Sequence, residues 1–437
     1  MSRKIKNQIP LLITITFLSI FYFMGVGEVP FHPDESTQIF MGRDIELLFS
    51  QPSAVKFNPE DADNLRQKYR LLDPPLSRWF IGSAQILFKL PPLENDWDWS
   101  KSWDDNIRNG ALPSAEMLII ARLAVCFVFP ATLYLSYQIG QSLGGKPTAW
   151  LNLFLTALNA LVLLHTRRAM AESLLIFFYC MTLYWAVKPQ KPTWLIALPA
   201  ALAFNAKYSA VSLFLTGTIF CFFYPPKHPN KTNILKSLLF YALLCILITF
   251  LLNPVLWNSP LKAVKAAALE RQTLLEAQTK AIGSYNPAQT PSTLSGRLLA
   301  VVAQVYIAPP AVADVGNYLT ATQPQSSIYF SRPWNDLTSG FFRGGFLLAF
   351  SLIGLILMIR HQFSTSVKLP NPQFLFILAF LFQIAAILIG IPLSFQRYYL
   401  PLLPYITIFI AYAVEAGLCS GLNHSPQKAD SSINMPS

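Results

Sequence analysis

The sequence predicts an all-α polytopic membrane protein with about 10, and at most 12, transmembrane helices. Of its 437 residues, 53% are hydrophobic and only 13% are charged, about half the charged fraction of a soluble domain, which is roughly 25%. The mean hydropathy is +0.41. The apolar residues form blocks near the ~20 residues that a helix needs to cross a membrane. This pattern excludes a disordered chain, a disulfide-stapled secreted domain and an ordinary cytosolic enzyme.

Two long polar stretches, 28–112 and about 254–340, interrupt the apolar blocks. The first block has the basic start of a signal peptide but no clear A-x-A cleavage site, so we interpret it as an uncleaved helix. The ten blocks are 9–26, 113–138, 148–165, 171–187, 193–206, 208–224, 233–252, 341–359, 371–392 and 398–417.

Two of these boundaries are less obvious than the others. Residues 148–187 would make a helix of about 60 Å, twice the membrane width, so the charged segment 167–172 is predicted to be a hairpin tip. Residues 193–224 could form one tilted helix. Lysines at both ends favour the same side of the membrane, however, which predicts two short helices broken at Asn205-Ala206-Lys207.

The distribution of charge predicts the orientation. The net charge is +11, and fourteen of the 22 acidic residues lie between Glu28 and Asp105. No basic run is interleaved with aromatic residues, so a nucleic-acid partner is not expected. Short cytoplasmic segments would hold twelve Lys and Arg residues against four in short external turns (Arg167, Arg168, Lys207 and Arg397), which places both termini in the cytoplasm and both long loops outside. The twelve are Arg3, Lys4, Lys6, Lys146, Lys188, Lys191, Lys227, Lys231, Lys236, Arg360, Lys368 and Lys428.

The predicted organisation has four parts. Residues 1–258 form a transmembrane module that includes the first external loop, 28–112. Residues 259–340 form a second external loop, in which 261–281 has the spacing of an amphipathic helix. We expect this loop to cover the site and select the acceptor, unless it is a passive linker. Residues 341–417 are C-terminal transmembrane helices and 418–437 a cytoplasmic tail. The apolar stretches 79–93 and 298–313 are predicted to be interfacial; if both crossed, the count would be twelve.

The first external loop holds the candidate catalytic acids. Asp34 and Glu35 follow the first helix at the outer membrane surface, where an ionised carboxylate suits a general base. Asp34 could instead cap a helix over 36–49. Asp73 precedes two prolines at the end of the same loop, where it could approach Asp34 or act as another helix cap.

Cationic residues near hydrocarbon usually pair with an acid or bind a ligand. Arg167, Arg168, Lys207 and Arg397 are expected on the outer face; an Arg168–Glu172 pair is the structural alternative to ligand binding. Arg122 lies inside the second helix, with Glu116 as a possible partner in sequence.

Other motifs are weak. Asp61-Ala62-Asp63 and Asp96-Trp97-Asp98 match a metal-binding DxD pattern that occurs by chance in acidic loops. Trp97, Trp99 and Trp103 could stack on a sugar, although a membrane aromatic belt also explains them. The chain has no P-loop, GxGxxG, HExxH or GxSxG motif, and its five cysteines have no CxxC spacing.

The order of motifs is more specific than any one of them. It runs His32-Pro33-Asp34-Glu35, Asp73-Pro74-Pro75-Leu76, Arg122, 167–172, 205–208, 252–257 and Arg397-Tyr398-Tyr399. This order resembles the GT-C membrane glycosyltransferases, in particular the dolichyl-phosphate-mannose protein mannosyltransferases and the related aminoarabinose lipid A transferases. The resemblance covers residues 1 to about 258 and is looser beyond them.

The resemblance implies an inverting glycosyltransferase that moves a sugar from a polyprenyl-phosphate carrier to a glycan, lipid or protein hydroxyl on the outer, periplasmic face of the plasma membrane. Asp34 would be catalytic, with Glu35 beside it and Asp73 as a second acidic site. No cofactor is expected and a metal is not required. A transporter or flippase for an anionic lipid or lipid-linked glycan is the alternative, although no internal repeat supports it. Arg78 would replace a cation that relatives carry near the Pro-Pro-Leu segment. The residues expected to bind the substrate or its phosphate are Arg78, Arg122, Arg167, Arg168, Glu172, Lys207 and Arg397.

Overall fold

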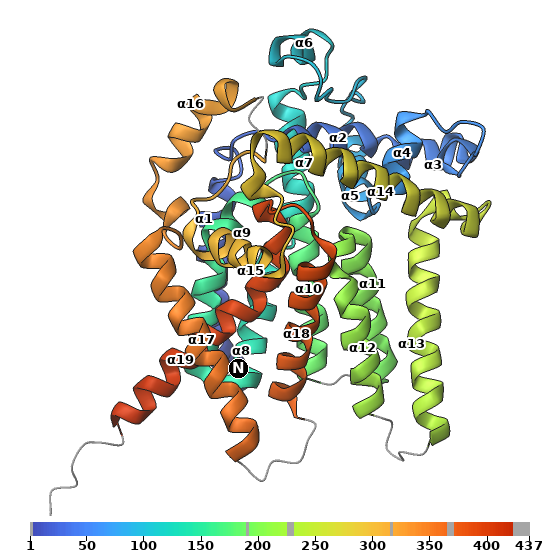
Figure 1. Cartoon of the computed structure of the whole chain (residues 1–437). Coiled ribbons are helices and arrows are strands. Elements are labelled where there is room, and N and C mark those ends of the chain that lie inside the picture. The colour runs from blue at the N-terminus through green and yellow to red at the C-terminus, as the bar shows by residue number, and fades with distance from the viewer. Residues whose placement is uncertain (1–2, 189–191, 225–230, 315–317, 365–370, 423–437) are drawn as a thin grey trace, which may run out of the picture.

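The computed structural model describes residues 3–188, 192–224, 231–314, 318–364 and 371–422, and this part of the chain is helical and contains no strand. Figure 1 shows an upright bundle with further helices over one end, which we call the loop face. The bundle contains α1 (Arg3–Met24), α7 (Ala115–Cys126), α8 (Phe129–Ala157), α9 (Ala160–His165), α10 (Glu172–Val187), α11 (Ala197–Ala206), α12 (Ser212–Phe223), α13 (Lys231–Leu252), α17 (Phe341–Ser364), α18 (Pro372–Gly390) and α19 (Leu403–Leu422).

The two long polar stretches form most of the loop face and supply its helices. These are α2 (Pro33–Gly42), α3 (Asp44–Ser50), α4 (Leu65–Leu72), α5 (Leu76–Leu87), α6 (Trp103–Arg108), α14 (Pro260–Tyr285), α15 (Leu294–Val302) and α16 (Leu319–Phe330). A π-helical turn, η6 (Ala303–Ile307), continues α15. Short 3-10 turns are η1 (Pro52–Val55), η2 (Thr193–Ile196), η3 (Tyr208–Val211), η4 (Pro254–Leu256), η5 (Pro287–Gln289), η8 (Pro333–Asp336) and η9 (Gln396–Leu402).

Five helical segments within the described residues are long and apolar enough to cross a membrane. They are Ala115–Ala157, Lys231–Leu252, Phe341–Phe363, Pro372–Gly390 and Gln396–Leu418. Shorter apolar helices occupy the remaining predicted blocks, including Gln8–Met24 and Glu172–Val187. The chain is therefore an α-helical membrane protein, and the number of about ten crossings stays a prediction.

The longest of these segments reverses direction inside α8. Gly145 has φ 87°, a left-handed conformation that glycine adopts without steric cost. The two arms then pack side by side, because Ser136 Oγ lies 2.8 Å from Thr156 Oγ1 and Asn152 donates a 2.7 Å hydrogen bond to the Ser136 carbonyl. The turn falls between the predicted blocks 113–138 and 148–165.

Two predicted helix breaks are confirmed. Helix α11 ends at Ala206, Lys207 is extended, and the chain restarts as η3 and α12. The charged segment 166–171 separates α9 from α10. Both breaks leave ionisable side chains between helices.

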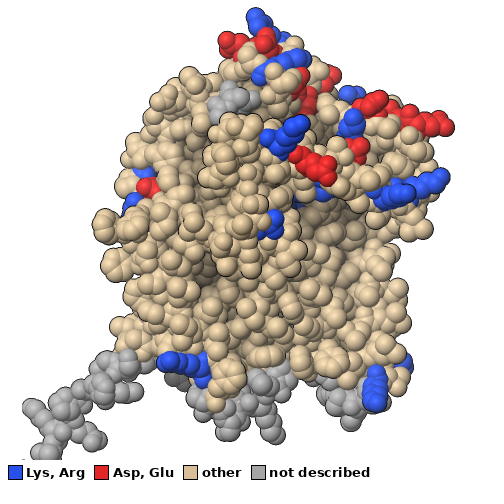
Figure 2. Space-filling view, viewed as in Figure 1, with Lys and Arg blue, Asp and Glu red and all other residues tan. Residues whose placement is uncertain are grey.

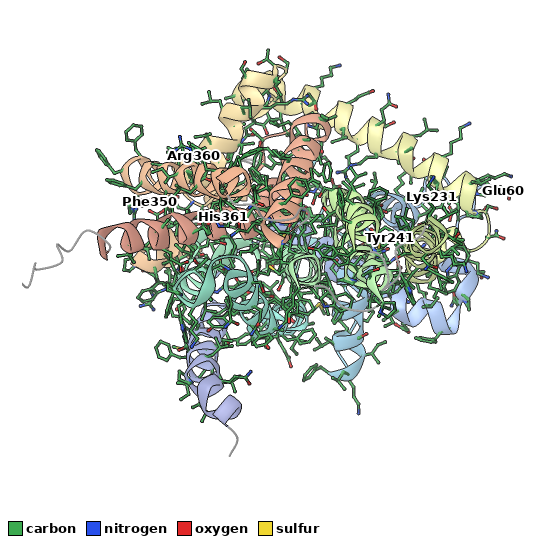
Figure 3. All side chains as sticks on the ribbon, turned by 90° about the horizontal axis from the view of Figure 1, so that it is seen from below. Glu60, Lys231, Tyr241, Phe350, Arg360 and His361 are labelled. Carbon is green, nitrogen blue, oxygen red and sulfur yellow. The ribbon has the colours of Figure 1, made fainter. Side chains whose placement is uncertain are left out.

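Few charged side chains appear on the middle of the bundle surface seen in Figure 2. On the face shown in Figure 2, acidic residues gather over the loop face, and Lys and Arg alone mark the opposite end. Figure 3 looks at that opposite end and labels Lys231 of α13 with Arg360 and His361 of α17. Lys191, Lys227, Lys368, Lys428, tail residues 423–437 and the side chains of Arg3, Lys4 and Lys6 lie outside what the structure describes.

The amphipathic helix predicted over 261–281 is present as the longer α14, which lies across the loop-face ends of α11 and α13 (Figure 1). The stretch 79–93 overlaps the end of α5, and the stretch 298–313 overlaps the end of α15 and includes η6. One apolar core joins residues from α1 to α19, so the predicted part 341–417 packs directly on the predicted module 1–258.

Helices α2 and α5 touch backbone to backbone. A Cβ atom on Gly82 would lie 2.0 Å from the Gly42 carbonyl oxygen, so only glycine permits this approach. The contact brings α2, which carries Asp34, against α5, which begins three residues after Asp73.

Candidate active site

A cavity of about 770 Å³ lies between α14 and the loop-face ends of α10 and α11. The surface in Figure 2 is hollowed just below the ridge that α14 forms. Four carboxylates line the cavity: Asp34, Asp73, Glu172 and Asp314. Lys207, Arg271 and Arg397 provide its cations, and Leu274, Ile282 and Phe395 are among its apolar wall residues.

Asp34 lies in the first turn of α2 but does not cap it. The N-cap is His32, whose Nδ1 accepts the Asp34 backbone N–H at 3.1 Å, while the Glu35 carboxylate accepts the His32 N–H. The helix starts at Pro33 and is separate from α3, so the capping role and the single helix over 36–49 are both wrong. Because His32 satisfies the helix end, the Asp34 carboxylate faces the cavity with 29% of its side chain exposed.

Arg397 forms an ion pair with Asp34 through Nη1. Burial alone would raise the pKa of Asp34, but the charge of Arg397, supported by His32, lowers that pKa below its usual value. Asp34 is therefore ionised at neutral pH, as a group that accepts a proton must be.

Asp314 contacts the same guanidinium from the other side. Its Oδ2 lies 2.8 Å from Arg397 Nε and 3.3 Å from His32 Nε2. Since His32 Nδ1 accepts a hydrogen bond, we assign the ring proton to Nε2, which donates to Asp314. Burial opposes ionisation of Asp314, yet Arg397 and the hydrogen bond from His32 together hold its pKa far below the usual range.

Lys207 and Glu172 form a second ion pair at the cavity wall. Lys207 Nζ lies 2.5 Å from Glu172 Oε1, and their side chains are 18% and 1% exposed. The helix break at Lys207 and the start of α10 at Glu172 bring these residues together. The Arg168–Glu172 pair predicted as an alternative does not form.

Asp73 and Arg271 line the same cavity from different loops. Burial raises the pKa of Asp73 above its usual value, and the charge of Arg271 on α14 is the largest effect that opposes the rise. The Asp73 backbone carbonyl accepts a 2.6 Å hydrogen bond from Arg78. Asp73 ends α4, and α5 has no side-chain cap, so Asp73 does not cap the next helix.

Glu35 does not line the cavity, although it is next to Asp34 in sequence. It is fully buried and forms a two-pronged ion pair with Arg122, both contacts at 2.8 Å. The Ala169 backbone N–H also donates to it at 2.8 Å. Arg122 thus pairs with Glu35 and not with Glu116, and both residues tie α2, α7 and the segment before α10 together.

Three more predicted phosphate ligands lie outside the cavity lining. Arg78 is buried against Asp44, which also forms an ion pair with Arg70. Arg167 donates to the Tyr22 carbonyl at the end of α1. Arg168 donates to the carbonyls of Pro30 and Val312. In the structure these guanidinium groups hold backbone segments in place.

The described residues contain no group of three or more His, Cys, Asp or Glu side chains that could hold a metal. In the two DxD matches, Asp96 accepts from Tyr69 and Asp98 from Ser100, while Asp61 bonds Asn64. Trp97 and Trp103 pack against Phe31, whereas Trp99 lines the cavity.

Sequence reasoning missed Asp314 and Arg271 as site residues. Asp314 is the single acidic residue between Glu276 and Asp336 in the sequence, an isolated acid in a polar stretch. Arg271 was visible only as one charge among several on the amphipathic helix. Neither pattern indicates which distant residues lie near Asp314 and Arg271 in the folded protein.

No protein-family profile and no curated protein matches the chain. Two solved structures of archaeal oligosaccharyltransferase from Archaeoglobus fulgidus are similar to it. One, a crystal structure with Zn and sulfate, has 13% identity and a TM-score of 0.43, with 80% of this chain and 41% of that chain covered. The other, AglB with an inhibitory peptide and a dolichol-phosphate, has 11% identity and a TM-score of 0.47, with 98% and 53% covered. The chain spans about half or less of those structures, and TM-scores below 0.5 do not assign an activity.

Proposed function

We propose that the protein is an inverting membrane glycosyltransferase that uses a polyprenyl-phosphate sugar as donor. The observation that carries this proposal is the position of Asp34, an ionised and partly exposed carboxylate in a large cavity that also holds Lys207, Arg271 and Arg397. A volume of about 770 Å³ is in the range of small-ligand sites, roughly 300–1,000 Å³. The motif order that resembles the GT-C glycosyltransferases supports the same class.

The donor phosphate would bind among the three cations. Charge-assisted hydrogen bonds to guanidinium groups suit phosphate oxygens, and Lys207 adds a point charge to the same cavity lining. Leu274, Ile282 and Phe395 offer an apolar surface for the first isoprene units. A cavity at the ends of apolar helices allows the rest of the lipid to stay in the membrane.

The transfer step needs one base and one stabilised leaving group. The acceptor oxygen attacks the sugar C1, its proton passes to the Asp34 carboxylate, and the bond from C1 to the phosphate oxygen breaks with its electron pair kept by the polyprenyl phosphate. Attack opposite the leaving phosphate inverts the anomeric centre. Arg397, Arg271 and Lys207 stabilise the released charge, and the step requires no metal ion or cofactor.

The acceptor would approach from a second cavity of about 360 Å³. Asp314 and Phe395 line both cavities, so the two meet beside the Asp34–Arg397 pair. Within the described part of the chain, Asp314 is the one charged residue that lines the second cavity, whose other polar side chains include Gln289, Gln304 and Gln396. This chemistry suits an uncharged, hydroxyl-bearing acceptor.

We place the loop face outside the cell, with both termini in the cytoplasm and the protein in the plasma membrane. The charge pattern of Figure 2 supports this orientation, because cationic residues mark the end opposite to the acid-rich loop face. Glu35, Arg78, Arg122, Arg167 and Arg168 would support the site without touching the donor.

The test is transfer by the reconstituted protein from a radiolabelled polyprenyl-phosphate sugar. We expect Asp34→Asn to lower transfer at least about 100-fold, since a positioned base typically contributes 10²–10⁴-fold, with unchanged membrane insertion. Asp98→Asn is the matched control, because Asp98 is an exposed loop acid that binds Ser100. Full activity of Asp34→Asn would remove the assigned base. Movement of the carrier across vesicles without transfer would instead identify a transporter.

A further inference from the structure

Arg397 is shared between two carboxylates that come from different external loops. Its Nη1 pairs with Asp34, from the first loop, and its Nε lies 2.8 Å from Asp314, from the second. Only one other cavity cation, Lys207, has an ion pair among the described residues, and that pair is with Glu172. An arriving phosphate must therefore compete with a carboxylate for Arg397.

The two carboxylates hold Arg397 differently. The Asp34 side chain is 29% exposed, and within the described part of the chain Arg397 is the side chain that donates to it; the neighbouring His32 nitrogen already accepts a hydrogen bond. The Asp314 side chain is 6% exposed, and its Oδ2 also lies 3.3 Å from His32 Nε2. Asp34 is thus the partner that a ligand in the cavity can reach and replace.

We propose that Asp314 is a positioning residue that keeps Arg397 in the cavity while the donor phosphate displaces Asp34 from it. This inference rests on the proposed function and adds an order of events to it. In the free protein the Asp34 carboxylate is ion-paired with Arg397 and is therefore not available as a base. Once a phosphate takes over Nη1, Asp34 is released towards the acceptor while Asp314 still orients the guanidinium.

The exchange has a clear physical logic. Breaking a buried ion pair is costly when it leaves one charge without a partner. Here one anion replaces another on Arg397, and the released Asp34 remains partly solvated. Loss of the neighbouring cation also makes the Asp34 carboxylate a stronger proton acceptor. The base would therefore become available only when a donor is bound.

Binding of farnesyl phosphate to the purified full chain tests the exchange without any transfer. We expect Asp34→Asn to tighten binding about tenfold, since it removes the carboxylate that must be displaced. Asp314→Asn should change binding less than about threefold, because the gain from a lost negative charge is offset by a poorly oriented Arg397. Farnesol should show no difference among the variants, and inorganic phosphate shows whether the site takes the anion without its lipid.

If both substitutions tighten the binding of farnesyl phosphate equally, or if only Asp314→Asn tightens it, the exchange is overturned. In either case, transfer by the unaltered protein would still support the proposed function. No binding of farnesyl phosphate or inorganic phosphate by the unaltered protein would overturn both.

The transfer assay gives a second readout. Asp314→Asn should lower kcat about tenfold with the donor KM changed less than about threefold, since Asp34 stays paired with Arg397. Asp314→Glu, which keeps the charge, should recover most of the rate. A merely structural role predicts that the rate falls only in proportion to the loss of folded protein, with no selective recovery by Glu, and that result would contradict the assignment.

Discussion

The chain contains two ion-pair networks that differ in their relation to solvent. In the buried network, Glu35 meets Arg122 and Asp44 meets Arg70, with every one of these side chains at most 7% exposed. In the cavity network, Asp34 meets Arg397 and Glu172 meets Lys207, and one member of each pair is 18% to 29% exposed. Asp34 and Glu35 are neighbours in sequence, yet they belong to different networks.

The difference in solvent exposure distinguishes structural charged side chains from candidate ligand-binding ones more clearly than residue type does. The buried network is completed by backbone groups: Arg122 also donates to the Val26 carbonyl, and Arg70 to the Ala54 carbonyl. Such groups have little capacity left for a substrate. In the cavity network the cation of each pair, Arg397 or Lys207, can exchange its carboxylate partner for an incoming anion.

The largest expected effect is loss of stability on breaking the buried network. Glu35→Gln should destabilise the fold by about 3–5 kcal/mol, because Arg122 would be left buried without its counter-ion. The measurement is thermal unfolding in detergent. Glu116→Gln is the control, since Glu116 is an exposed residue at the start of the same helix as Arg122. An unchanged melting temperature with selective loss of transfer would place Glu35 in the catalytic machinery instead.

A smaller effect is expected for a cavity cation that lies outside both networks. Arg271→Ala should raise the donor KM about tenfold through the loss of one charge-assisted contact to phosphate. Stability should hardly change. Lys262→Ala on the same helix is exposed, lies away from the cavity lining and should have no effect. An unchanged KM in Arg271→Ala would limit the donor site to Lys207 and Arg397.

The smallest expected effect concerns Asp73, whose pKa is raised by burial. When burial raises the pKa of a carboxyl group in the folded protein, the free energy of unfolding is lower at any pH above that raised pKa. This loss disappears as the pH falls below the pKa of the same group in the unfolded chain, about 4. Asp73→Asn should therefore raise the melting temperature at pH 7 by about 1 °C, and this gain should vanish near pH 4.

The lowered pKa values of Asp34 and Asp314 have the opposite consequence: the stability from their ion pairs is present above the usual carboxyl pKa of about 4 and is lost only as the pH falls through the lowered, folded-state pKa. Relative to the unaltered protein, the stability change caused by Asp73→Asn should therefore shrink between pH 7 and pH 4, whereas the loss caused by Asp314→Asn should persist to pH 4. A loss in Asp314→Asn that has already disappeared at pH 4 would mean that the pKa of Asp314 is not lowered.

Local sequence patterns were sufficient for the features that depend on neighbouring residues. The break at Lys207 followed from lysines at both ends of one apolar block, and α14 followed from helical spacing between charges. The position of Asp34 just beyond the first apolar helix followed from the end of that apolar block. Each of these depends on hydrophobic periodicity and length, which a single sequence displays.

Partner choice among charged residues could not be predicted in the same way. Arg122 has Glu116 six residues away but pairs with Glu35, 87 residues away, because both lie on the inner sides of α7 and α2. Arg168 and Arg167 bind backbone carbonyls, an outcome with no sequence signature. The long loop 259–340 was predicted to select the acceptor, and that role stays a prediction. The structure shows that this loop supplies Arg271 and Asp314 to the cavity that holds the candidate base.

The pairing of Asp34 with Arg397 also has a consequence for biosynthesis. The two residues are 363 positions apart. At about 5 to 20 residues per second, a ribosome needs roughly 20 to 70 s to add the chain between them. During that interval Asp34 is already translated while its counter-ion does not yet exist. The site can therefore be completed only after the last helices have been inserted, and a chain that ends before Arg397 would be released without a finished cavity.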